Sequence, residues 1–108
     1  MIHCDARYLE IVEALLTRHL PGIEVWVFGS RATGERLKRF SDLDLALITD
    51  EPLDAATLTK LKTAFEESSL PFKVDIVEWR SVDESFRSLI QRDHQLLSRG
   101  SVRSRREP

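Results

Sequence analysis

Two aspartates one residue apart, Asp42 and Asp44, stand where a polar stretch gives way to an apolar run that ends at Ile48. Residues two apart in a strand point to the same face of a sheet, so this spacing places both carboxylates together at the entrance of a strand. Mg²⁺ is bound in many phosphate-handling sites by one or two carboxylates, with water and substrate phosphates as its other ligands. The pair therefore predicts a metal site for chemistry on a phosphate.

A third aspartate, Asp75, interrupts the apolar run over residues 74–77. An unpaired carboxylate inside such a strand is costly to desolvate, and a bound metal would offset that cost. Three carboxylates suit two metal ions, which activate the attacking oxygen and stabilise the leaving phosphate during in-line displacement. Considered alone, Asp75 is explained better by an edge strand that faces water. Its position after the Asp-x-Asp pair is what favours a shared site.

A Gly-Ser pair, Gly29 and Ser30, directly follows the apolar and aromatic run over residues 25–28. Glycine lets the backbone turn without a Cβ penalty and lets another group approach closely, and serine offers a hydroxyl and a backbone N–H. If a short helix begins over residues 31–37, its free N–H groups face the turn and form a small anion site. Arg31 beside the turn is a further candidate for contact with phosphate. The other basic residues of this stretch are interpreted as a solvated face: Arg36, Lys38 and Arg39.

In this order, the Gly-Ser pair, the Asp-x-Asp pair and the third aspartate resemble the motif of the minimal nucleotidyltransferases of the DNA polymerase beta-like superfamily. The resemblance covers about residues 25–77, most of the chain. Phosphatases of the haloacid-dehalogenase type and many glycosyltransferases also use Asp-x-Asp, but there the apolar strand comes before the aspartates. The resemblance implies these roles: metal binding and catalysis for Asp42, Asp44 and Asp75, with Asp75 activating the acceptor hydroxyl, and binding of the nucleotide phosphates for Gly29, Ser30 and Arg31.

The same resemblance implies an enzyme with a two-metal Mg²⁺ site that transfers AMP from ATP to a hydroxyl. Stand-alone members of this size are often antitoxins that attach AMP to a tyrosine of an all-helical ribonuclease toxin of the HEPN class, which is the partner expected here. Two alternatives stay open. One is a non-catalytic antitoxin or scaffold that binds a helical partner by contact alone, and the other is a small-molecule nucleotidyltransferase that acts as a homodimer.

The composition limits the function further. A chain of 108 residues is long enough for one small core and leaves no room for a second, acceptor-binding domain. Its formal net charge of -2 argues against general nucleic-acid binding, which relies on a basic surface. Cys4 is the single cysteine, and we expect neither a membrane span nor a secretory leader. We therefore predict a cytoplasmic protein whose minimal nucleotidyltransferase domain covers residues 1–98, followed by a basic, disordered tail over 99–108.

The hydrophobic periodicity predicts alternating helices and strands that would position these residues. The expected elements are a helix between the cap Asp5 and Pro21, a strand over 23–28, a short helix over 31–37, a strand from 42 to 48, a helix capped by Asp54, a strand over 72–78, and a helix from a Ser81–Glu84 capping box to Arg99. The last helix is expected to carry four apolar residues: Phe86, Leu89, Ile90 and Leu97. This order predicts an α/β nucleotidyltransferase fold with a small mixed β-sheet flanked by helices, although it does not fix the strand order.

Overall fold

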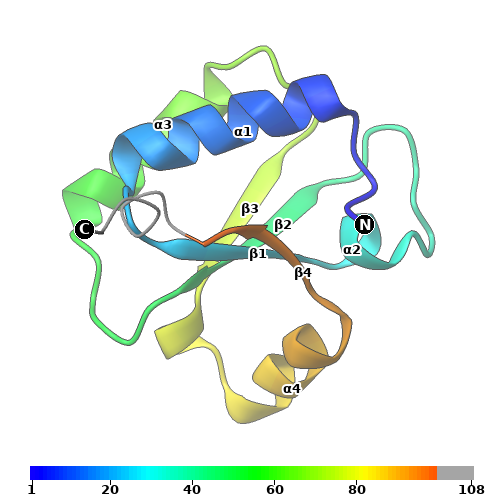
Figure 1. Ribbon diagram of the computed structural model, residues 1–108. Coiled ribbons are helices and arrows are strands. Elements are labelled where there is room, and N and C mark those ends of the chain that lie inside the picture. The colour runs from blue at the N-terminus through cyan, green and yellow to red at the C-terminus, as the bar shows by residue number, and fades with distance from the viewer. Residues whose placement is uncertain (100–108) are drawn as a thin grey trace, which may run out of the picture.

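A four-stranded mixed sheet forms the centre of the protein, with the strand order β3-β2-β1-β4 (Figure 1). The computed structural model describes residues 1–99. β1 (Glu24–Phe28) lies antiparallel to both β2 (Leu43–Ile48) and β4 (Gln95–Ser98), and β2 lies parallel to β3 (Val74–Glu78). The prediction of a small mixed sheet flanked by helices is confirmed.

Helices lie on both faces of this sheet (Figure 1). α1 (Ala6–His19) and α3 (Ala55–Glu66) cover one face, and α3 provides the crossover that the parallel strands β2 and β3 require. α4 (Glu84–Asp93) lies on the opposite face, after the short 3₁₀ turn η1 (Trp79–Ser81). α2 (Ser30–Thr33) is a single turn just beyond the end of β1.

The two helices on the core side begin at the aspartate caps that the sequence predicts. The side chain of Asp5 accepts a hydrogen bond from the backbone N–H of Arg7, and that of Asp54 accepts one from the backbone N–H of Thr57. Each bond satisfies a backbone donor that has no partner within its helix, which stabilises the helix by about 1 kcal/mol.

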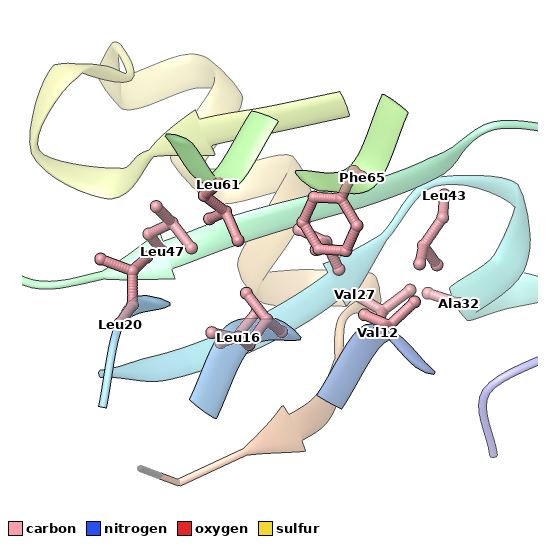
Figure 2. Packing of buried hydrophobic residues seen from close by; sticks show 11 residues of the cluster. Val12, Leu16, Leu20, Val27, Ala32, Leu43, Leu47, Leu61 and Phe65 are labelled. Atoms are coloured by element: carbon pink, nitrogen blue, oxygen red, sulfur yellow. The ribbon is translucent and has the colours of Figure 1, made fainter. Parts of the chain in front are cut away.

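The core lies between the sheet and the pair α1 and α3 (Figure 2). Alternate residues of β1 and β2 point into it, and every one of them is almost completely buried: Val25, Val27, Leu43, Leu45 and Leu47. They pack against apolar residues that recur at helical spacing: Val12, Leu16, Leu20, Leu61 and Phe65. Because strand residues alternate between faces, the intervening Asp44 points to the opposite face, which carries α4.

The last helix is shorter than the sequence predicts. Asp83 is its N-cap rather than Ser81, since the Asp83 carboxylate accepts a hydrogen bond from the backbone N–H of Phe86 at 2.8 Å. The helix ends at Asp93, and the chain continues as β4 along the free edge of β1. Pairing with β1 provides partners for backbone groups of both strands, which outweighs the helical pattern of the sequence.

The apolar residues assigned to that helix separate into different environments. Leu97 lies in β4 and packs against the core from the sheet. On α4 only Ile90 is buried, whereas Phe86 is 37% exposed and Leu89 is 51% exposed. The prediction that all four residues lie on one helix was therefore wrong, because Leu97 belongs to β4.

The short helix after the Gly-Ser pair is also shorter than predicted. Gly34 ends it with φ of 80°, a left-handed conformation that glycine adopts readily, and its backbone N–H donates to the carbonyl of Ser30 at 2.7 Å. Residues 35–42 then form a loop that leads to β2. The predicted tail over 99–108 stays a prediction, because all of it except Arg99 lies outside the described residues. Among residues 1–99, no helix is both long enough and apolar enough to cross a membrane.

Candidate active site

The parallel pairing of β2 and β3 brings two of the predicted aspartates side by side. In this register Asp44 stands opposite Asp75, and both follow the alternation that points away from the core. Asp42 lies just before β2 and is exposed, whereas Asp44 and Asp75 are half-buried. The sequence alone gave no strand order, so this neighbourhood is a finding of the structure.

The Gly-Ser turn lies against one of these carboxylates, that of Asp44. β1 pairs with β2 so that Phe28 stands opposite Asp44, and Gly29 follows immediately. Gly29 has φ of 75° and ψ of -156°, a backbone conformation open almost only to glycine. A Cβ atom built there would overlap Oδ2 of Asp44. Glycine is therefore required twice at this position, for its backbone conformation and for the close approach of the carboxylate.

Burial and the neighbouring carboxylates change the pKa of Asp44. The pKa of Asp44 is raised to about 6, first because the side chain is partly removed from water and then because Asp75 and Asp42 are negatively charged neighbours. A cation beside Asp44 would remove the electrostatic part of this cost. Asp75 already has one basic neighbour, since its Oδ1 lies 3.5 Å from Nζ of Lys73 in a largely exposed ion pair.

These carboxylates suit Mg²⁺ only in part as they stand. Among residues 1–99, no group of three or more histidine, cysteine or acidic side chains lies close enough to hold a metal ion by itself. Mg²⁺ needs no such group, because it keeps several waters and takes one or two carboxylates together with substrate phosphates. The hard oxygen donors and the raised pKa of Asp44 fit a cation that binds together with a nucleotide.

Arg31 is buried, and its guanidinium binds backbone carbonyls. It donates to the carbonyl oxygens of Ser41 at 2.9 Å, His3 at 2.9 Å and Arg39 at 3.4 Å, and it stacks over the ring of Phe72 at 4.4 Å. The side chain thus joins the N-terminal segment, the loop before Asp42 and the approach to β3. A direct contact of Arg31 with the nucleotide stays a prediction, and the geometry favours a positioning role.

An apolar hollow lies beside the Gly-Ser turn, on the side of α4. It has a volume of about 490 Å³, and its apolar lining consists of Phe28, Phe86, Leu89 and Ile90. Gly29 and Ser30 form part of its wall. Sequence reasoning missed this site because it identified these residues only as the apolar residues of a helix. Apart from the helical spacing of those residues, the sequence holds no signal that would separate a core face from a cavity wall.

Aromatic contacts fix α4 and its flanking segments against the sheet. The ring of Trp26 on β1 stacks on His94 with a centroid distance of 3.8 Å and meets Trp79 edge to face at 5.3 Å. Nε and one terminal nitrogen of Arg87 donate to the backbone carbonyl of Trp79. Phe28 contacts Phe86 edge to face at 5.6 Å. The hollow therefore has a wall whose position is set by packing at both ends of α4.

Comparison with known proteins gives a consistent result. Residues 10–101 match the family described as "Polymerase beta, Nucleotidyltransferase". Over 84 residues the chain is 46% identical to the Probable protein adenylyltransferase MntA of Haemophilus influenzae, covering 78% of this chain and 73% of that protein.

Two solved structures share the fold. One is a toxin-antitoxin with AMP-PNP, with a TM-score of 0.68 and 23% identity, covering 88% of this chain and 76% of the other. The second is a tri-AMPylated HEPN toxin of Shewanella oneidensis in complex with its MNT antitoxin, with a TM-score of 0.64 and 20% identity, covering 92% of this chain and 75% of the other.

Proposed function

Because the chain belongs to the polymerase beta nucleotidyltransferase family, we propose that it transfers AMP from ATP to a tyrosine hydroxyl of a helical HEPN toxin and so acts as an antitoxin. The observation that carries this proposal is the contact between the Gly-Ser turn and Asp44, with Asp75 in register beside it. The relative from Haemophilus influenzae is named a probable protein adenylyltransferase, and the two structures that share the fold are toxin-antitoxin complexes.

In the proposed reaction the acceptor oxygen attacks the α-phosphorus of ATP, and the bond from that phosphorus to the β-phosphate oxygen breaks. Pyrophosphate leaves, and the proton of the hydroxyl passes to the carboxylate of Asp75 and on to solvent. The backbone at Gly29 and the hydroxyl of Ser30 hold the β and γ phosphates in line with the attacking oxygen. When bound by Asp42 and Asp44, Mg²⁺ would supply positive charge that stabilises the transferring phosphate and the leaving group.

The acceptor approaches, in this proposal, across the outer edge of β3. No strand among residues 1–99 pairs with that edge, since β3 is the last strand of the sheet. A hollow of about 450 Å³ lies there between α3 and β3, and Asp75 and Lys73 form part of its lining. A partner protein placed over this edge would bring both the acceptor side chain and the surface that excludes water. The cytoplasm, where ATP and Mg²⁺ are available, is the expected location.

Intact-mass spectrometry of the HEPN toxin tests the proposal directly. The toxin is incubated with this protein, ATP and Mg²⁺, and we expect its mass to rise by whole AMP units. The double variant Asp42→Asn, Asp44→Asn should add none. A matched control with the same charge change in an exposed loop, Asp50→Asn, Glu51→Gln, should add AMP as the wild type does.

Two results would contradict transfer to the toxin. If the toxin binds without gaining mass, the chain is an antitoxin that acts by contact alone. If the isolated chain consumes ATP on small hydroxyl compounds and leaves the toxin unmodified, the small-molecule alternative applies. Binding of the toxin is measured separately by gel filtration, so that a lost complex is not mistaken for lost chemistry.

A further inference from the structure

The loop between α2 and β2 displays large apolar side chains among basic ones (Figure 1). Leu37 is 36% exposed and Phe40 is 57% exposed. The same loop carries three exposed cations, and none of them forms an ion pair within residues 1–99: Arg36, Lys38 and Arg39. The loop is therefore locally basic in a chain whose formal net charge is -2.

Hydrogen bonds hold this loop in one conformation. The backbone N–H of Lys38 donates to Oγ of Ser41 at 2.8 Å, and the backbone N–H of Ser41 donates to the carbonyl of Lys38 at 3.2 Å. The buried guanidinium of Arg31 donates to the carbonyl oxygens of Arg39 and Ser41. Arg36 has φ of 57°, a left-handed conformation that is uncommon for a residue with a side chain and persists only where the surroundings enforce it. The apolar side chains are thus displayed by a built loop.

The loop adjoins the approach to β3. Arg39 and Phe40 line a small hollow of about 170 Å³ together with Pro71 and Phe72. Phe72 also lines the hollow at the outer edge of β3, to which Asp75 belongs. The two hollows therefore share a wall, and the loop borders the edge across which the acceptor is proposed to approach.

A protein that brings a tyrosine to this site must cover the loop as well. A specific interface buries about 800 Å² on each partner, which corresponds to a patch roughly 30 Å across. Phe40 stands two residues before Asp42, a chain distance of at most about 7 Å, so a patch that contains the carboxylates includes it. Aromatic residues and arginine are enriched in interface cores, where a few of them carry most of the binding energy.

Basic and aromatic side chains also occur in RNA-binding sites, so the two kinds of partner must be separated. Single-stranded nucleic acid is bound along a positively charged groove that follows several phosphates. In this chain the cations are confined to one short loop, and the aspartates of the site lie directly beside them. This arrangement favours a protein surface that has an apolar recess with an acidic rim.

We propose that the loop over residues 36–40 docks the acceptor protein. Leu37 and Phe40 enter an apolar recess of the acceptor protein, and the cations of the loop face acidic side chains around that recess. The inference rests on the proposed function, which makes the acceptor protein a HEPN toxin. The loop then determines which protein is modified, and the chemical step is left to the aspartates.

Kinetics of AMP transfer with the toxin as the varied substrate test the role of the apolar residues. We expect Leu37→Ser and Phe40→Ala each to raise the KM for the toxin about 10-fold, the loss that follows from removing one central interface contact. The Kd for the toxin, measured by surface plasmon resonance, should rise in parallel. The kcat at saturating toxin and the Kd for MgATP should change less than about 2-fold, because the interaction with the toxin is lost equally before and during the reaction.

A charge reversal tests the cations through the rate of association. Arg39→Glu should slow association with the toxin about 10-fold at low salt, and the difference from the wild type should shrink in about 0.5 M NaCl. Two control variants make matched changes elsewhere. Leu96→Ser replaces a leucine that is 37% exposed on β4, at the sheet edge opposite to β3, and Arg18→Glu reverses an exposed charge in the last turn of α1. Both should bind the toxin as the wild type does, and circular dichroism shows that every variant is folded.

Several outcomes would overturn the docking role. Unchanged KM and Kd for the toxin in Leu37→Ser and Phe40→Ala would do so, as would equal weakening by the two controls. A parallel loss of MgATP affinity would assign the loop to the nucleotide site. Loss of binding to a single-stranded RNA oligonucleotide by Arg39→Glu, with toxin binding unchanged, would make the loop an RNA site. The proposed function fails separately: a wild-type protein that binds the toxin through the loop and adds no AMP refutes transfer and leaves the docking role in place.

Discussion

The two faces of the sheet differ in what their side chains require. On the face covered by α1 and α3, alternate residues of β1 and β2 are apolar and almost completely buried, and they need only matching volume (Figure 2). On the other face, half-buried Asp44 of β2 stands beside Asp75 of β3, and the turn at Gly29 lies against the Asp44 carboxylate. Large apolar side chains of α4 are exposed on this face. Packing on the first face stabilises the fold. On the second face the ionised carboxylates repel one another, and a bound cation would reduce this repulsion.

The largest effect on stability is expected from the core face. Leu45 is completely buried and directly follows Asp44 in β2. Leu45→Ala should lower the free energy of unfolding by about 2–5 kcal/mol, the usual cost of a cavity left by a buried leucine. Urea denaturation measures this loss. The Kd of the folded protein for MgATP should stay within about 2-fold of the wild type, because the Leu45 side chain points to the core face and Asp44 points to the other. A large change in affinity without loss of stability would contradict the separation of the two faces.

A smaller loss is expected at Arg31, which is buried but lies next to the site. Arg31→Met removes the donor to three backbone carbonyls and should lower the free energy of unfolding by about 2–3 kcal/mol. Arg39→Met, at an exposed arginine that stacks on Phe40, is the control and should change it by less than about 0.5 kcal/mol. If Arg31→Met instead kept its stability and lost MgATP binding, the predicted direct contact with the nucleotide would be supported.

The smallest expected change in the free energy of unfolding concerns the charge of Asp44. Unlike the two changes above, removal of this charge should stabilise the protein. Its pKa of about 6 in the folded protein exceeds the ordinary 3.8, so the folded state holds this proton to higher pH than the unfolded state does. Stability due to this group therefore falls as pH rises from about 4 to about 6 and stays lower above that. Asp44→Asn removes the effect. In EDTA at pH 7 the variant should be more stable by roughly 1 kcal/mol, after allowance for the half-exposed side chain.

Thermal unfolding across pH checks this prediction. The difference between Asp44→Asn and the wild type should shrink as the pH falls from about 6 and disappear only below the ordinary pKa of 3.8, where Asp44 is largely protonated in both states. Addition of Mg²⁺ with ATP at pH 7 should raise the Tm of the wild type and leave that of the variant nearly unchanged, because a ligand stabilises only the state that binds it. A variant that is less stable than the wild type at pH 7 in EDTA would show that the ionised carboxylate is not costly.

Much of the fold follows from local patterns that the sequence states clearly. The caps Asp5 and Asp54, the apolar runs that became β1 and β2, and the apolar spacing of α1 and α3 agree between sequence and structure. Each of these features depends on residues that are only a few positions apart in the chain, so it can be recognised in a single sequence. The spacing of Asp42 and Asp44 predicted correctly that they stand at the entrance of a strand.

The remaining features depend on contacts between distant parts of the chain. Gln95–Ser98 became a strand because the free edge of β1 offers hydrogen-bond partners, while the local sequence continues a helical pattern without a glycine or proline. The register of Asp44 with Asp75 requires the strand order, which no local pattern contains. The exposure of Phe86 and Leu89 depends on what covers α4, and the buried position of Arg31 depends on three carbonyls from two other segments.

The most direct test of the central claim, that the Gly-Ser turn and the aspartates form one transfer site, compares two glycine variants. Gly29→Ala places a methyl group where Oδ2 of Asp44 lies, whereas Gly34→Ala has the same unfavourable φ but meets only the ring of His3. AMP transfer to the toxin, measured by mass per folded molecule, should fall about 100-fold or more in Gly29→Ala and less than about 3-fold in Gly34→Ala. Equal activity of the two variants would contradict the claim, because displacement of Asp44 by the turn would then have no consequence for the reaction.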